Sequence, residues 1–251
     1  MSIGNTLIDI RELQHSYANG TVSLQGIDLR IAQGESVALV GPNGAGKTSL
    51  FLCLAGLVPF KARQFHIGEI NALEGGNRKK LAAKAALLFQ DSDDQLVCPT
   101  VEEDVAFGPL NLGATPEEAR RRALAALSQV GLLHIKDRVP HRLSGGEKRR
   151  VALAGLLAMN PDILLLDEPS QFLDHRSRRA LIRILKENEH PKLIATHDFE
   201  LALEICSRVI VLDQGKVVAD GPIREIFANK ELLEAHGLEQ PPSLGGNHLP
   251  S

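Results

Sequence analysis

The chain has 251 residues, 43% of them hydrophobic, and its formal net charge is −3 at pH 7. This length can bury a full core, so one α/β domain of the larger kind is expected. Acidic and basic residues are interspersed, and no basic tail or stripe indicates binding to nucleic acid. The cysteines lie far apart without a C-x-x-C pair, which predicts reduced thiols rather than a metal or disulfide site.

The sequence shows no segment that would place the protein within a membrane. Near the N-terminus, Asp9, Arg11 and Glu12 interrupt the apolar residues, so no secretory signal is visible there. The longest apolar stretches, 151–159 and 163–166, are far too short to cross a bilayer. If the protein serves a membrane, we expect it to act from the cytosolic face through partner proteins.

Strand and helix patterns alternate along the chain. Apolar and polar residues alternate as in half-buried antiparallel strands at 6–10 and 24–31. Apolar runs predict buried strands at 36–40, 85–89, 163–166 and 192–195, and a hairpin is predicted from 209–212 and 216–219. Helical spacing predicts helices at 48–57, 116–130, 146–159 and 176–186. The order indicates a mainly parallel central sheet wrapped by helices, with an antiparallel β subdomain.

The domain organisation follows from shifts in this pattern. Between Asp91 and Asn160 the pattern turns helical, which predicts an inserted helical subdomain over about 91–160. Residues 1–236 are expected to form one domain. The remaining stretch, 237–251, is rich in Pro, Gly, Asn and Ser and is predicted to be a flexible C-terminal tail.

A complete G-x-x-x-x-G-K-T phosphate loop follows the predicted strand 36–40. It comprises Gly41, Pro42, Asn43, Gly44, Ala45, Gly46, Lys47 and Thr48, with Ser49 next in the helix. The glycines let the backbone curl and present its N–H groups to phosphate oxygens. Lys47 supplies positive charge to the β- and γ-phosphates, and Thr48 offers a hydroxyl to Mg²⁺. The strand before the loop and the helix after it argue against a coincidental glycine-rich turn.

Two acids end the apolar strand at 163–166. Asp167 is placed at the carboxyl end of a strand, where a carboxylate can hold a hydrated Mg²⁺. Glu168 would then lie next to the γ-phosphate and polarise the attacking water. The alternative interpretation is a pair of solvated acids at a strand end.

A second glycine motif, L-S-G-G-E, precedes the predicted helix at 146–159. Ser144, Gly145 and Gly146 would present amides and a hydroxyl at a helix N-terminus, which is an anion site. The simpler alternative is that Ser144 serves as an ordinary N-cap.

The phosphate loop, the strand ending in Asp167-Glu168 and L-S-G-G-E together resemble the ATP-binding cassette (ABC) family, over about 7–237. The resemblance implies an ABC-type P-loop NTPase fold and an ATPase that uses ATP and Mg²⁺. It also implies a head-to-tail dimer, with itself or a paralogous ATPase. In that dimer Ser144, Gly145, Gly146 and Glu147 would close on the nucleotide held by the other subunit.

Further positions match the family pattern one by one. Tyr17 falls where the family places an aromatic ring against adenine, although a surface tyrosine is the alternative. Gln90 matches the glutamine that touches Mg²⁺ and senses the transmembrane partner. Asp174 matches the aspartate of the D-loop, the segment after the Asp167-Glu168 acids, and His197 matches the histidine that contacts the γ-phosphate. The resemblance thus makes Lys47, Glu168 and His197 the candidate catalytic residues.

One segment is similar to a narrower group. The run F-Q-D-S-D-D-Q-L at 89–96, followed by V-E-E-D-V-A-F-G-P at 101–109, resembles the ATPases of energy-coupling factor (ECF) importers. Those usually have proline where this chain has Ser92. His141-Arg142 and the stretch 232–239 resemble the cobalt/nickel branch. The resemblance implies a peripheral subunit at the cytoplasmic face of the membrane, whose region from Gln95 to Asn111 receives a coupling helix of transmembrane subunits.

The resemblance to ECF ATPases leaves alternatives open for the function of the chain. Gln171 and Phe172 depart from the small or aliphatic residues usual in the D-loop, which leaves the symmetry of the two ATP sites in doubt. The chain could serve another ABC importer or exporter, or be a soluble assembly-factor ATPase. Repair ATPases would need coiled-coil insertions and ribosome-acting ones a second cassette, and the sequence has neither. The histidines are too scattered to form a binding site for the transported metal.

Overall fold

The computed structural model describes residues 6–92 and 94–245. The strands are β1 (Thr6–Ser16), β2 (Val22–Ala32), β3 (Ser36–Val40), β4 (Gln64–Ile67), β5 (Ile70–Asn71), β6 (Ala85–Leu88), β7 (Ile163–Asp167), β8 (Lys192–Ala195), β9 (Arg208–Asp213) and β10 (Lys216–Pro222). The helices are α1 (Lys47–Leu54), α2 (Leu81–Lys84), α3 (Val101–Asn111), α4 (Pro116–Gln129), α5 (Gly145–Ala158), α6 (His175–Glu187), α7 (Phe199–Ile205), α8 (Ile223–Ala228) and α9 (Lys230–Ala235). Short 3₁₀ turns cover Asn77–Lys80, Leu133–Ile135 and Pro140–Arg142.

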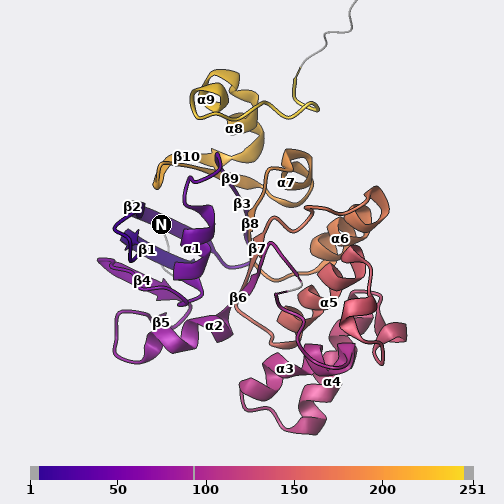
Figure 1. Cartoon of the computed structure of the whole chain (residues 1–251). Coiled ribbons are helices and arrows are strands. Elements are labelled where there is room, and N and C mark those ends of the chain that lie inside the picture. Colours follow the sequence, from indigo (N-terminus) through magenta and orange to yellow (C-terminus); the bar gives the residue numbers. More distant parts are fainter. Residues whose placement is uncertain (1–5, 93, 246–251) are drawn as a thin grey trace, which may run out of the picture.

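Two sheets form the framework. The first has the strand order β2-β1-β4-β5 and is antiparallel throughout. The second has the order β10-β9-β3-β8-β7-β6, and all its pairs are parallel except the β9–β10 hairpin. Figure 1 shows the antiparallel sheet on one side of the central sheet and α3, α4, α5 and α6 on the other. The predicted α/β fold, with its antiparallel sheet and helical segment, is confirmed.

Side chains of the central strands alternate between two cores. In β7, Ile163 and Leu165 face the core shared with the antiparallel sheet and α1, whereas Leu164 and Leu166 face the core shared with the helices. All four are fully buried. A strand buried on both faces must be apolar at every position, which explains the continuous apolar run in the sequence.

The parallel order brings distant segments to one edge of the sheet. Strands β3, β8, β7 and β6 are neighbours in that order and run in the same direction. Their carboxyl ends lead into Gly41, Thr196, Glu168 and Phe89, respectively. Ligands of such sheets bind outside these carboxyl ends, so the fold alone gathers the predicted motifs at one place.

The helix after the phosphate loop is shorter than the sequence indicates. We predict it over 48–57 because its apolar spacing continues, but α1 ends at Leu54. Gly56 has a left-handed backbone with a φ of 71°. Its N–H donates to Cys53 O (3.0 Å), and that of Leu57 donates to Leu52 O (2.8 Å). These are the two bonds of a Schellman C-cap, for which glycine is the usual residue.

Part of the predicted tail packs against the domain. Leu238 is buried, and the Gln240 side chain donates to the carbonyls of Phe227 (3.1 Å) and Ala228 (3.2 Å). The N–H of Ser243 donates to the Glu200 carboxylate (3.0 Å). Residues 237–245 are therefore ordered by contacts with α7 and α8, which differs from the flexible tail that the composition predicts. The remainder of that predicted tail, 246–251, lies outside the described residues.

We expect Leu165→Ala to lower the free energy of unfolding by about 2–5 kcal/mol, because it leaves a cavity in a core strand. Leu73→Ala is the matched control, since Leu73 is 47% exposed and its truncation should cost less than about 0.5 kcal/mol. Urea denaturation of both variants measures the difference. Equal losses would contradict the assignment of Leu165 to the core.

Candidate active site

The phosphate loop has a backbone that only glycine allows at two positions. A side chain at Gly41 would place its Cβ 2.0 Å from the carbonyl oxygen of Leu212. At Gly46, where φ is 107°, a Cβ would lie 2.6 Å from the carbonyl oxygen of Ser23. The loop therefore packs directly on neighbouring backbone and keeps the curled shape that presents its N–H groups.

The Lys47 ammonium folds back over this loop. Its Nζ donates to the carbonyls of Gly41 (2.6 Å) and Pro42 (3.1 Å). Burial lowers the pKa of Lys47, and the nearby carboxylates of Glu168 and Asp167 oppose that shift. A phosphate group placed in the loop would replace the carbonyls as the partner of the ammonium and gain a charge-assisted bond.

Oxygen donors from two elements meet beside the loop. The hydroxyl of Thr48, at the start of α1, donates to Asp167 Oδ2 (2.8 Å) at the end of β7. Burial raises the pKa of Asp167, although the bond from Thr48 and the charge of Lys47 lower it. A hydroxyl and a desolvated carboxylate side by side fit Mg²⁺, which prefers oxygen ligands. Thr48, Asp167 and Gln90 would hold the ion, and the ion would supply charge to the phosphates.

Glu168 and His197 face each other across the end of the sheet. Glu168 Oε2 accepts from the backbone N–H of His197 (3.2 Å) and from the Thr196 hydroxyl (3.4 Å). His197 Nε2 lies 3.5 Å from Glu168 Oε1, an oxygen without a hydrogen-bond partner. Burial raises the pKa of Glu168, while burial and then Lys47 lower the pKa of His197. A desolvated carboxylate with one free oxygen is suited to accept a proton from water.

Tyr17 closes one side of the same cleft. Its hydroxyl lies 2.7 Å from Ser49 Oγ, and its ring packs edge-on against His15 with centroids 4.9 Å apart. The cleft has a volume of about 490 Å³. Its lining includes Tyr17, residues 43–49, Gln90, Asp167, Glu168, Gln171 and His197. The structure thus brings together predicted residues from five separate segments.

The L-S-G-G-E motif and Asp174 do not line this cleft. Ser144 begins α5 with a capping box, in which its N–H and its hydroxyl both donate to Glu147 Oε2 (2.8 Å each). Asp174 caps α6 by accepting from the N–H of Ser177 (2.9 Å). A Cβ at Gly146 would come 2.3 Å from Ser177 Oγ, so α5 and α6 begin in close contact. Within one chain, the simpler N-cap interpretation describes what these residues do.

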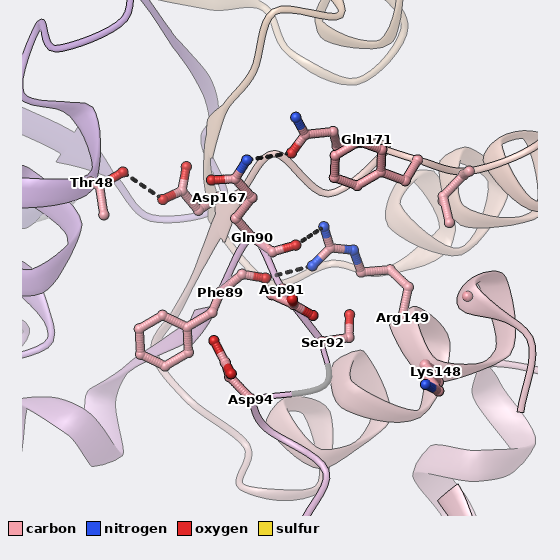
Figure 2. A pocket seen from close by; sticks show the side chains of 13 residues that line it. Thr48, Phe89, Gln90, Asp91, Ser92, Asp94, Lys148, Arg149, Asp167 and Gln171 are labelled. Atoms are coloured by element: carbon pink, nitrogen blue, oxygen red, sulfur yellow. Dashed lines mark hydrogen bonds between the residues drawn. The ribbon is translucent and has the colours of Figure 1, made fainter. Parts of the chain in front are cut away.

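Arg149 is a functional candidate that the motif analysis misses. Its guanidinium donates to the carbonyls of Phe89, Gln90 (2.8 Å) and Glu168 (2.8 Å), and the first two bonds are drawn in Figure 2. The side chain comes from α5 and joins the ends of β6 and β7. The available signal was its helical spacing, because Arg149 shares the buried face of α5 with Leu153 and Leu156.

Neither a cluster of metal-binding side chains nor a membrane-spanning helix is present in the described parts of the chain. In residues 6–92 and 94–245, no group of three or more His, Cys, Asp or Glu side chains could hold a metal ion. No helix in those residues is long and apolar enough to cross a membrane.

Comparison with known sequences identifies the family to which this chain belongs. The sequence model of the ABC transporter family matches residues 24–171. This chain belongs to the ABC transporter family. An ABC transporter ATP-binding protein of Geobacter sulfurreducens is 48% identical over 240 residues, which are 96% of each chain. The energy-coupling factor transporter ATP-binding protein EcfA of Methanothermobacter thermautotrophicus is 44% identical, over 94% of this chain and 77% of that protein.

Solved structures agree with the assignment. CbiO1 from Clostridium perfringens, part of the ABC transporter complex cbiONQ, has a TM-score of 0.79 and 36% identity, over 92% of this chain and 94% of that one. A dimeric ATP-binding cassette bound to ADP and Pi has a TM-score of 0.74 and 28% identity, over 86% and 98% of the two chains. The chain is therefore an ABC ATPase that binds and hydrolyses ATP, and its cassette is of a kind that forms dimers.

We expect Lys47→Ala to weaken ATP binding by roughly 10- to 150-fold, because the variant lacks the cation that would meet the phosphates. Lys79→Ala, at an exposed lysine outside the cleft, is the control and should bind ATP normally. Isothermal titration calorimetry measures both affinities. Unchanged affinity in Lys47→Ala would remove the loop from the nucleotide site.

Glu168→Gln should retain ATP binding but slow hydrolysis by about 10²–10⁴, because an amide fits the space and cannot take a proton from water. At saturating Mg-ATP we expect this variant to accumulate as a dimer in size-exclusion chromatography. A Glu168→Gln chain that hydrolyses ATP at the normal rate would exclude Glu168 as the base.

His197→Ala should also slow ATP hydrolysis, with a smaller effect on ATP binding.

Proposed function

We propose that this ATPase powers an ECF-type importer at the cytoplasmic face of the membrane, with cobalt or nickel ions as the transported substrate. The names of EcfA and of cbiO1 within the cbiONQ complex support the proposal. So does the F-Q-D-S-D-D-Q run at 89–95. The structural observation that carries it is an exposed apolar surface on α3 and the loop before it.

This surface, which we call the α3 face, consists of Val97, Phe107 and Leu110. The exposed fractions of these residues are 71%, 50% and 43%, respectively. Val101 and Val105 of the same helix are fully buried, so the apolar residues of this region divide between the core and the α3 face. An exposed apolar face of this kind favours a partner protein, and an amphipathic helix docks on such faces through apolar anchors.

A chain of hydrogen bonds connects the α3 face to the ATP site. Asp104 Oδ1 accepts from the N–H groups of Val97 and Cys98 (2.9 Å each), which ties the loop to α3. The Gln95 side chain accepts from Phe89 N–H and donates to Leu87 O (3.0 Å each), which ties the same loop to β6. Movement of a docked helix can therefore reach the segment that carries Gln90.

The acids of α3 make contacts within this chain. Glu102 pairs with Arg120 (2.6 Å) and Lys136 (3.7 Å), and Glu103 completes a capping box with Thr100. They support α3 within this chain, and they lie in the region from Gln95 to Asn111 that we expect to receive the coupling helix. Reversing their charges would damage the helix itself, so the apolar residues give the cleaner test.

In the proposed mechanism, Tyr17 stacks on adenine and Lys47 binds the β- and γ-phosphates. Glu168 takes the proton of the attacking water, while His197 contacts the γ-phosphate. Ser144, Gly145, Gly146 and Glu147 bind the ATP of the second subunit through the N-terminus of α5. The solved dimer of a similar cassette supports an arrangement with two chains.

The D-loop, residues 170–174, supports the same dimer. Phe172 is 90% exposed and its φ is 60°, a left-handed conformation that bulky residues rarely adopt. Both features cost free energy in a single chain, and burial of the ring against a second cassette would offset them. We place Phe172 and Asp174 at the interface between the two subunits.

We expect Phe107→Asp to reduce recovery of the membrane subunits at least about tenfold when the chain is purified from membranes, as loss of an interface anchor does. Leu133→Asp is the control, because Leu133 is 43% exposed on a different segment. Both variants should bind ATP normally. If Phe107→Asp assembles like the wild type, the α3 face is not the docking surface.

Uptake of radioactive cobalt and nickel tests the substrate. A strain that lacks this chain should lose uptake of one of these ions, and the wild-type gene should restore it. The Glu168→Gln gene should not, because transport depends on hydrolysis. Normal metal uptake in the deletion strain, with loss of a vitamin instead, would contradict the metal assignment and leave the importer assignment intact.

A further inference from the structure

The side chain of Gln90 is held by a second glutamine of the same chain. Gln90 Nε2 donates to Gln171 Oε1, and the two atoms are 2.6 Å apart. Gln171 lies in the D-loop, in the turn that follows Glu168. Both glutamines line the cleft that contains Thr48 and Asp167, and Figure 2 shows their bond directly above the Arg149 guanidinium.

The direction of this bond selects one orientation of the Gln90 amide. A glutamine carries one oxygen acceptor and one NH₂ donor, and only the oxygen can bind Mg²⁺. Because Gln171 accepts from the nitrogen, Gln90 Oε1 is turned away from the D-loop. In Figure 2 this oxygen lies on the side of Asp167, whose carboxylate bonds Thr48.

The backbone beneath the pair is fixed. Arg149 donates to the carbonyls of both Gln90 and Glu168 (2.8 Å each). The N–H of Gln171 also donates to the carbonyl oxygen of Glu168 (3.1 Å). Little backbone freedom remains to be lost when the two side chains meet, so the entropic cost of the bond is confined to the rotamers of the two glutamines.

We propose that Gln171 is a positioning residue for the Mg²⁺ site, which acts by fixing the orientation of the Gln90 amide. The proposal rests on the proposed role of Gln90 as a Mg²⁺ ligand. In this proposal Gln171 is not itself a ligand of the ion, although it lines the same cleft. Gln171 Oε1 accepts a hydrogen bond from the amide nitrogen of Gln90 and so keeps that nitrogen from turning toward the ion. The Gln90 oxygen is therefore already oriented for the ion before the ion binds.

The test compares Gln171→Leu, which lacks the acceptor, with Gln171→Glu, which keeps one. Binding of Mn²⁺, as a probe for Mg²⁺, is measured by electron paramagnetic resonance on the full chain with a non-hydrolysable ATP analogue. We expect Gln171→Leu to weaken Mn²⁺ binding by about two- to twelvefold, the range for loss of one hydrogen bond. Gln171→Glu should restore it, and affinity for the analogue in EDTA should not change in Gln171→Leu, which adds no charge to the cleft.

ATPase assays give a second readout. In Gln171→Leu the half-saturating Mg²⁺ concentration should rise by the same factor, while kcat at saturating Mg²⁺ changes by less than about twofold. Gln90→Ala provides the matched background. There, Gln171→Leu should have no further effect on Mn²⁺ binding, because the residue that it acts through is absent.

Each other outcome overturns the proposal in a recognisable way. If Gln90→Ala weakens Mn²⁺ binding and Gln171→Leu does not, the role of Gln90 holds and that of Gln171 fails. If Gln90→Ala has no effect, both roles fail. Tighter Mn²⁺ binding in Gln171→Leu would show that the bond restrains Gln90 instead of presenting it. If Gln171→Leu weakens Mn²⁺ binding equally in the wild-type and Gln90→Ala backgrounds, Gln171 acts on the metal site without Gln90, and the proposal fails.

Discussion

One buried guanidinium holds the active site in its shape. Arg149 is 2% exposed, and it joins the carbonyls of Phe89, Gln90 and Glu168 at the ends of β6 and β7. Burial lowers the pKa of Arg149, although Asp91, Asp167 and Glu168 oppose this shift. Burying a charge is costly unless it is paired and hydrogen-bonded, and here the hydrogen-bond partners are three backbone carbonyls at the ends of two strands.

Through Arg149, helix α5 is part of the ATP site of its own chain. Arg149 belongs to α5, and the same helix begins at the L-S-G-G-E motif that is proposed to face the other subunit's nucleotide. A rotation of α5 that improves its contact with the second ATP would also move the carbonyls of Gln90 and Glu168, which Arg149 binds. The two ATP sites of a dimer would thus be mechanically connected through one rigid element, without a mobile linker.

The sequence predicts the framework well because burial imposes strong patterns. The bounds of β3 and β8 agree with the apolar runs at 36–40 and 192–195, and the parallel order explains why the motifs share one edge. The gathering of Tyr17, Lys47 and His197 in one cleft also agrees with the motifs, whereas their chemical roles remain proposals. Motif patterns recover these features because each depends on local sequence or on a family signature.

Features that depend on long-range pairing could not be predicted. The bond between Gln90 and Gln171 joins residues 81 positions apart, and no local pattern gives its direction. The short strands β4 and β5 carry too few residues for a clear alternation. The ordered segment 237–245 has the composition of a loop, yet its contacts with α7 and α8 fix it. The composition of a segment indicates how much apolar surface it can bury, but not which part of the protein it packs against.

We propose that a complete ATP site needs the phosphate loop of one chain and the L-S-G-G-E helix of a second. A structure of the Glu168→Gln chain with Mg²⁺ and ATP tests it most directly. We predict two nucleotides between two chains, with Ser144 and the α5 N-terminus of one chain on the γ-phosphate of the other. The metal ion should contact Thr48 and the Gln90 oxygen. ATP bound to a chain whose α5 N-terminus faces solvent would contradict the account.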